Sequence, residues 1–210
     1  MLLPVPPLLV ISDRHHARHP LVEVAEAVFT GGCRWFSLRE KDLPPEERRS
    51  LLATLVALGH RFGAVVMAHE DIEAVLAVGA DGVHLPSGAS PEAARARLPE
   101  KLIGASAHAA GEAAALLWAG ADYVTVSPVF LTESKPGYGP ALGLDDLSRI
   151  VARETGPVIA LGGVTAENAA ACIVAGAHGV AVMGEIMRAA DPRATVARIL
   201  RAMSGRSMPQ

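Results

Sequence analysis

The chain has 210 residues, half of them hydrophobic and a fifth charged, with a formal net charge of -3. This composition supports a sizeable buried core, and it excludes a basic nucleic-acid-binding surface and any apolar run near the ~18 residues of a membrane span. Residues 1–7 lack the charged segment of a signal peptide. We therefore expect one cytoplasmic domain over residues 1–210, with neither nucleic acid nor membrane as a partner.

Short apolar runs alternate with helical patterns along the chain, and many of the runs are bounded by glycine. The predicted strands cover residues 8–11, 34–38, 64–68, 82–85, 102–106, 123–126, 158–161 and 180–182. The predicted helices cover residues 21–30, 44–61, 71–78, 90–98, 111–119, 144–154, a segment between the last two strands, 185–189 and 192–203. Eight strand–helix units in series are typical of a (β/α)8 barrel.

A repeated joint supports this count. Gly-Ala-x closes a helix and begins a strand at 79–81, 120–122 and 176–178, which is the short αβ turn that each unit of a barrel needs. A doubly wound sheet would use similar joints, but its dinucleotide-binding form needs G-x-G-x-x-G after the first strand, and residues 12–15 do not supply it. We predict an α/β fold, a single-domain (β/α)8 TIM barrel.

The last two strands both end at glycines, Gly162-Gly163 and Gly184. Glycine lets backbone N–H groups come close to a ligand, and the loops after the last two strands of a TIM barrel often bind phosphate. The sequence therefore predicts an anion site at these glycines.

Other polar residues follow the remaining strands. Arg39 and Lys41 are alternate residues, so both cations could face one di-anionic group, although pairing with Glu40 and Asp42 is the alternative. The loop at 132–140 combines hydroxyls and a lysine with glycine and proline, a composition typical of a mobile lid.

Three histidines and two cysteines resemble metal sites only superficially. His15, His16 and His19 lie in an irregular loop that fixes no coordination geometry. Cys33 and Cys172 are far apart and neither belongs to a C-x-x-C pair. We expect the cysteines to be structural thiols.

Six segments together resemble the thiamine-phosphate synthase/TenI superfamily over nearly the whole chain. They are residues 36–41 (FSLREK), 77–85 (AVGADGVHL), 103–108 (IGASAH), 119–124 (AGADYV), 128–135 (PVFLTESK) and 157–163 (PVIALGG). The resemblance implies a TIM barrel. It also implies one of two activities: joining hydroxymethylpyrimidine pyrophosphate to thiazole phosphate with Mg²⁺, or, in the TenI branch, isomerising a thiazole phosphate.

The resemblance implies two groups of binding residues. The substrate-binding residues, which would contact the pyrophosphate, the pyrimidine and the thiazole, are Arg39, Lys41, Ser106, Thr132, Ser134 and Lys135. The phosphate-binding residues are Gly162, Gly163, Met183 and Gly184. The second group agrees with the glycine-ended strands.

The chain departs from the synthase pattern at the positions that bear on Mg²⁺. Synthases carry an Asn-Asp pair where this chain has His69-Glu70, and an acidic run where it has Ser-Gly-Ala at 87–89. Glu70 remains as the candidate metal ligand. Mg²⁺ is thus expected if the chain is a synthase, whereas a tautomerase would require no cofactor; residues 85–88 resemble the TenI branch.

A tautomerase needs a group that takes and returns a proton, and histidine is the residue type best suited to this. The TenI branch places its histidine where this chain has Pro128, so the candidate catalytic residues are His108 and His69. We expect a thiamine biosynthesis protein that binds a small heteroaromatic phosphate, with TenI-like thiazole tautomerase favoured over thiamine-phosphate synthase. A non-catalytic regulatory barrel is the third option, and a homodimer is one option for its assembly.

Overall fold

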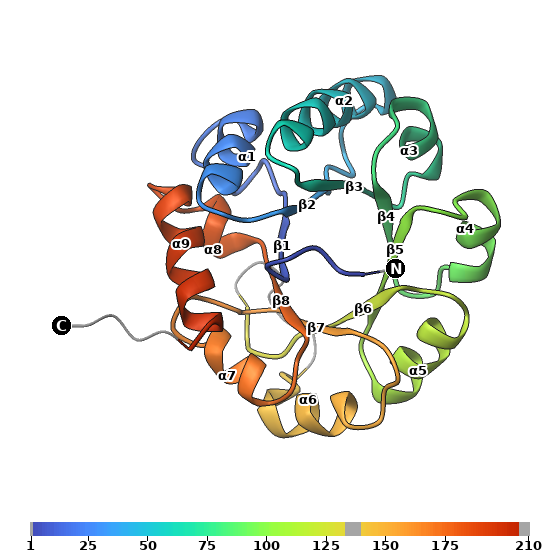
Figure 1. Cartoon of the computed structure of the whole chain (residues 1–210), viewed down its shortest axis with the longest axis vertical. Helices are drawn as coiled ribbons and strands as arrows, with labels where there is room; N and C mark the ends of the chain where they lie inside the picture. The colour runs from blue at the N-terminus through green and yellow to red at the C-terminus, as the bar shows by residue number, and fades with distance from the viewer. Residues whose placement is uncertain (1, 133–139, 206–210) are drawn as a thin grey trace.

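The computed structural model describes residues 2–132 and 140–205, which form a closed barrel of eight parallel strands inside a ring of helices (Figure 1). The strands are β1 (Leu8–Ile11), β2 (Trp35–Leu38), β3 (Val65–His69), β4 (Gly82–Leu85), β5 (Leu102–Ala107), β6 (Tyr123–Val126), β7 (Val158–Leu161) and β8 (Gly179–Val182). Strand order follows chain order, and β8 pairs with β1 to close the ring. The predicted TIM barrel is confirmed.

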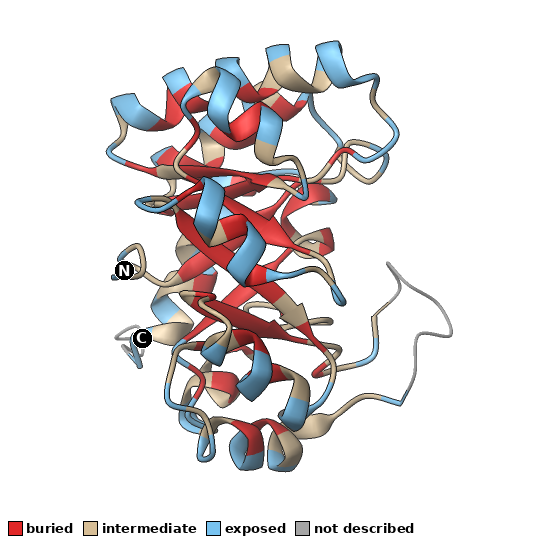
Figure 2. Cartoon of the chain, turned by 90° about the vertical axis from the view of Figure 1, so that its right-hand side faces the viewer, coloured by how far each residue is buried: buried red, intermediate tan, exposed pale blue. Residues whose placement is uncertain are grey.

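The helices lie outside the strands and expose their outer faces (Figure 2). They are α1 (Leu21–Thr30), α2 (Pro45–Arg61), α3 (Ile72–Val78), α4 (Pro91–Arg97), α5 (Ala110–Trp118), α6 (Gly143–Val151), α7 (Ala169–Val174), α8 (Gly184–Met187) and α9 (Pro192–Met203). At several of these helices the side chain of the N-cap residue accepts a hydrogen bond from a backbone N–H group. Ser90, predicted to begin a helix, accepts such a bond from the backbone N–H of Ala93.

Alternation along each strand divides the core in two. Leu8 and Val10 of β1 pack against the helices, while Leu9 and Ile11 point into the barrel. The inner core also includes Trp35, Met67, Leu102, Tyr123, Ile159 and Ala181. Bulky apolar side chains therefore fill the lower part of the barrel, so a ligand site lies above them.

Several predicted boundaries differ from the observed ones, and two of the differences have a clear local cause. Strand β3 extends to His69 because His69 pairs with His84 of β4. Helix α6 ends at Val151 instead of 154, since the N–H groups of Arg153 and Glu154 bond to carbonyls three residues back and tighten the last turn. Helix α8 covers Gly184–Met187, so it begins one residue and ends two residues earlier than predicted.

The predicted glycine joints are observed. Gly79, Gly120 and Gly176 have φ angles of 69°, 100° and 98°, a region that side chains disfavour and that glycine adopts freely. At the same end of the barrel, Leu3 packs against the inner core and Pro7 O accepts a hydrogen bond from Val180 N. The N-terminal segment therefore covers the end opposite the strand C-termini.

The surroundings of the two cysteines agree with the expected structural role. Cys33 and Cys172 are buried and free, and burial raises the pKa of their thiols to about 12 and about 11. Both thiols are therefore poorly reactive groups of the core.

No helix in the described part of the chain is long and apolar enough to cross a membrane.

Candidate active site

A cavity of about 520 Å³ opens at the C-terminal ends of the strands, and residues at the ends of all eight line it. This volume lies within the usual range for small-molecule sites. The predicted site residues that line it are Arg39, Lys41, His69, Ser106, His108, Thr132, Gly162, Gly163, Met183 and Gly184. Glu70 lines a neighbouring cavity that shares Lys41 and His69 with the first. Ser134 and Lys135 lie outside the described residues.

The Gly162-Gly163 turn forms one wall of the cavity. Both residues have positive φ angles, 94° and 64°. A Cβ on Gly162 would lie 2.7 Å from Pro128 Cα, and one on Gly163 would lie 2.4 Å from Leu131 O. The sequence predicted glycine here for close approach of a ligand, and the structure shows that the loop after β6 requires it as well.

Arg188 completes this wall, and sequence reasoning missed it. A Cβ on Gly184 would lie 2.7 Å from both terminal nitrogens of Arg188, so the guanidinium lies directly over the Gly184 backbone. Arg188 also lines the cavity. The spacing of four residues in a helical segment is the signal that could have identified this contact.

Arg39 and Lys41 lie on a different part of the wall, after β2, while Glu40 between them turns away. Glu40 is 2% exposed and accepts hydrogen bonds from Ser12 Oγ and from the backbone and side chain of Arg14. Lys41 pairs with Glu70. The alternative pairing of the two cations with Glu40 and Asp42 is therefore not observed.

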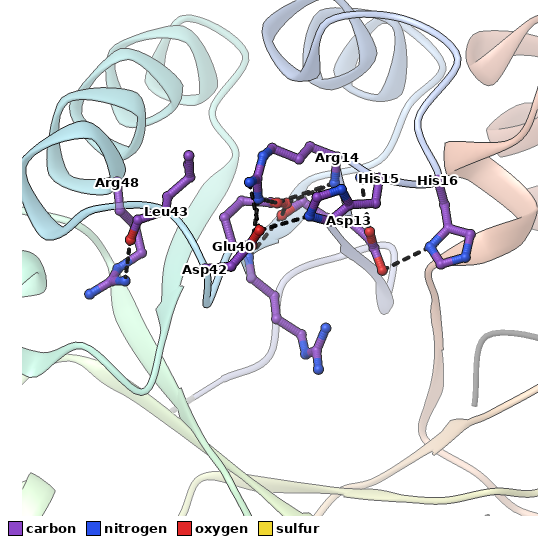
Figure 3. Close-up of polar contacts among 10 residues, drawn as sticks. Asp13, Arg14, His15, His16, Glu40, Asp42, Leu43 and Arg48 are labelled. Carbon is purple, nitrogen blue, oxygen red and sulfur yellow. Dashed lines mark hydrogen bonds and ion pairs between the residues drawn. The ribbon is translucent and has the colours of Figure 1, made fainter. Parts of the chain in front are cut away.

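Figure 3 shows the polar network beside this segment. Arg14 donates two hydrogen bonds to Asp42, of 2.5 and 2.6 Å, and His15 Nε2 lies 2.8 Å from the same carboxylate. The guanidinium holds the pKa of Asp42 well below its usual range. His16 pairs with Asp13 instead, so the adjacent histidines have separate carboxylate partners.

The two candidate catalytic histidines occupy different settings. His108 Nδ1 lies 2.8 Å from Ser127 O and donates to it, which fixes the ring and directs chemistry to Nε2. His69 stacks on His84 with ring centroids 5.4 Å apart, and its Nε2 lies 3.4 Å from Glu70. Both rings line the cavity.

Below them, His84 joins the cavity to the inner core. Its Nε2 lies 3.0 Å from Ser106 Oγ and its Nδ1 lies 3.0 Å from the Tyr123 hydroxyl. Burial, with a smaller effect of the Arg39 charge, lowers the pKa of His84 to about 4. Sequence reasoning did not connect Tyr123 and Thr125 to the site, although two polar side chains at alternate positions of an apolar strand are a usable signal.

A chain with this barrel and cavity has close relatives. Residues 8–186 match the family model described as thiamine monophosphate synthase. The chain belongs to this family. The superfamily suggested by the six sequence segments is thereby confirmed.

Individual members of the thiamine monophosphate synthase family show how far the similarity extends. A thiamine-phosphate synthase of Roseiflexus sp. is 36% identical over 188 residues, 88% of this chain and 80% of that protein. The bifunctional thiamine biosynthesis protein ThiM/ThiE of Symbiobacterium thermophilum is 41% identical over 180 residues, which are 85% of this chain and 38% of that protein. A solved thiamine phosphate pyrophosphorylase from Pyrococcus furiosus has a TM-score of 0.86 and 31% identity, and covers 94% of this chain and 95% of its own.

Proposed function

We propose that this chain is a thiamine-phosphate synthase, which joins hydroxymethylpyrimidine pyrophosphate to thiazole phosphate and releases pyrophosphate. The observation that carries this proposal is the division of one cavity between two anion-attracting walls. Arg39 and Lys41 follow β2, whereas Arg188 and the glycines follow β7 and β8. A transfer between two anionic substrates uses both walls, while isomerisation of one phosphate ester uses only one.

The two walls suggest how the substrates are placed. The guanidinium of Arg39 and the ammonium of Lys41 would bind the pyrophosphate, and Arg188 with the backbone at Gly163 and Gly184 would hold the thiazole phosphate. Anchoring each substrate at its anionic end brings the two rings together. A C–N bond then forms between the thiazole nitrogen and the pyrimidine methylene carbon as the C–O bond breaks, and its electron pair leaves on pyrophosphate.

Glu70, at the rim of the site, is a carboxylate that this chain could offer to a magnesium ion. Mg²⁺ is usually held by one or two carboxylates together with substrate phosphates. Glu70 fits that role at the rim, with Lys41 and His69 beside it, and the described residues contain no group of three or more His, Cys, Asp or Glu that could hold a metal without substrate. A bound Mg²⁺ would neutralise charge on the pyrophosphate.

Measuring pyrophosphate release from the two substrates, with and without Mg²⁺, tests the proposal. We expect release that requires both substrates and the metal. The proposal would be contradicted if folded protein that still binds thiazole phosphate released no pyrophosphate, with or without Mg²⁺. That result would favour the non-catalytic regulatory barrel.

A TenI-like tautomerase is the second candidate, and the setting of His108 favours it. The bond from Nδ1 to Ser127 O fixes an imidazole in the cavity that Gly163, Gly184 and Arg188 also line. His108→Asn keeps a hydrogen-bonding side chain and removes the base, so it should lower isomerisation about 10²-fold with phosphate affinity retained. An unchanged isomerisation rate would exclude His108 from the reaction.

Cytoplasmic location and assembly as a homodimer stay predictions.

A further inference from the structure

The carbonyl groups of Gly162 and Gly163 are both held by hydrogen bonds from outside the turn. Gly162 O accepts a 3.0 Å bond from the backbone N–H of Phe130, in the loop after β6. Gly163 O accepts a 2.9 Å bond from the side-chain amide of Asn168, the residue before α7. Glycine adopts many backbone conformations, so these two bonds, rather than the glycines themselves, select the conformation that is observed.

The orientation of the Asn168 amide follows from its two partners. Its Oδ1 accepts a 2.8 Å bond from the backbone N–H of Thr165, a group that can only donate, and its Nδ2 donates to the Gly163 carbonyl, a group that can only accept. A flipped amide would place donor against donor and acceptor against acceptor. Asn168 therefore bridges the turn between β7 and α7 in one defined way.

The held carbonyls fix the direction of two N–H groups. Both peptide units of the turn are trans, and in a trans peptide the C=O and N–H bonds point in opposite directions. The N–H of Gly163 therefore points away from Phe130, and the N–H of Val164 points away from Asn168. Gly163 and Val164 line the cavity, whereas Phe130 and Asn168, which are also described, do not. Both N–H groups thus face the cavity side of the turn.

These two N–H groups have no acceptor within residues 2–132 and 140–205. Val164 is only 4% exposed, and a buried N–H group is rarely left without a partner. On the same wall, the guanidinium of Arg188 lies over Gly184. An anion held at this wall would supply the acceptor that the protein does not.

We propose that Asn168 is a positioning residue for the phosphate group of the ligand. By holding the Gly163 carbonyl, it directs the N–H of Val164, beside that of Gly163, at the phosphate oxygens. Without this bond the peptide between the two residues is free to rotate and to turn its carbonyl, which repels an anion, toward the cavity. The inference rests on the proposed function only for the identity of the ligand as thiazole phosphate.

The direction of the Val164 N–H can be tested without an assay of activity. Thiazole phosphate is added to ¹⁵N-labelled protein, and the amide protons of Gly163 and Val164 are followed in ¹H–¹⁵N NMR spectra. We expect both protons to move to lower field, because each gains a hydrogen bond to a charged oxygen. A Val164 amide proton that does not move when the site is saturated would overturn the inference.

Asn168→Asp separates the two hydrogen bonds of this side chain. The carboxylate still accepts from the Thr165 N–H but cannot donate to Gly163 O. We expect thiazole phosphate to bind at least about tenfold more weakly, and hydroxymethylpyrimidine pyrophosphate, bound at the other wall, to stay within about twofold of its original affinity. A purely structural role would weaken both ligands alike. Unchanged binding of thiazole phosphate by folded Asn168→Asp would overturn the inference.

Two further variants separate the lost donor from the added charge. Asn168→Ala removes the donor without adding a charge, and it should weaken thiazole phosphate binding about as much as Asn168→Asp does. Ala170→Asp adds the same charge within the first turn of α7, and it should change binding less than about threefold because salt screens an exposed charge. Normal binding by folded Asn168→Ala, with a loss in Ala170→Asp, would show that charge alone causes the effect and would overturn the inference.

Failure of this inference and failure of the proposed function give different results. Pyrophosphate release by a protein whose Val164 amide proton is unmoved by thiazole phosphate would support the synthase and overturn the inference. Absence of release, with thiazole phosphate bound and the Val164 signal displaced, would overturn the synthase and support the inference. The NMR measurement on the unaltered protein decides the inference even if the Asn168 variants do not fold.

Discussion

Glu40 Oε1 accepts a 2.7 Å hydrogen bond from Ser12 Oγ, although the two residues are 28 positions apart in the chain. Both residues are at most 2% exposed. Ser12 Oγ also accepts a 2.8 Å bond from the backbone N–H of Arg39. A buried carboxylate after β2 thus anchors the segment that directs Arg39 into the cavity.

Replacing Glu40 by Gln should therefore destabilise the protein. The change removes one of the two carboxylate charges that Arg14 pairs with and leaves buried donors imperfectly matched, which should lower the free energy of unfolding by about 1–3 kcal/mol. Urea denaturation at pH 7 measures this loss. Glu46→Gln is the control, because the Glu46 side chain is 83% exposed and its pair with Arg49 should contribute less than ~1 kcal/mol. Equal stability of the two variants would contradict the anchoring role.

Gly184→Ala should displace Arg188 without unfolding the chain. The new Cβ would lie 2.7 Å from the terminal nitrogens of Arg188, and a flexible side chain can move away at little cost. We expect thiazole phosphate to bind roughly tenfold more weakly, since a hydrogen bond to a charged group contributes about 1.5–3 kcal/mol. Gly111→Ala in α5 is the matched control, because its added Cβ would meet nothing within 4 Å apart from its own helix backbone and chain neighbours. Unchanged affinity in Gly184→Ala would show that the guanidinium does not bind the phosphate.

Mutations at the two walls of the cavity should weaken the binding of different substrates. Arg39→Ala should weaken pyrimidine pyrophosphate binding roughly 10- to 100-fold and leave thiazole phosphate binding nearly unchanged, and Arg188→Ala should do the opposite. Calorimetry with each substrate alone measures both effects. A variant that weakened both ligands equally would indicate one shared anion site and would argue against the bisubstrate arrangement.

His84 should make stability fall in mildly acidic solution. Burial, with the charge of Arg39, lowers its pKa in the folded state to about 4 from a usual 6.5. Between these values the unfolded chain binds a proton that the folded chain does not, so stability is full above pH 6.5 and decreases as the pH falls. Lowering the pH from 7.5 to 5.5 should cost about 1.4 kcal/mol from this residue. Urea denaturation of metal-free protein at both values should show a smaller decrease for His84→Gln, and an equal decrease would refute this assignment.

The sequence by itself determined the barrel and the end of it that carries the site. Apolar runs too short for helices, and glycines that adopt φ angles of 69°, 100° and 98° at the joints, are local features that act through the backbone. Because the strands are parallel, all of their C-terminal residues meet at one end. Arg39, His108 and Gly163 could therefore be placed in one cavity without knowledge of any side-chain contact.

Only the tertiary structure decided which polar groups act on one another. Pairing of Glu40 with Arg39 or Lys41 was an open alternative in the sequence, yet Glu40 is buried against Ser12, and Lys41 pairs with Glu70 instead. The contact between His84 and Tyr123 joins residues 39 positions apart. Such contacts depend on strand register and on the direction of each side chain in the closed barrel, and neither quantity is encoded in the spacing of residues along one segment.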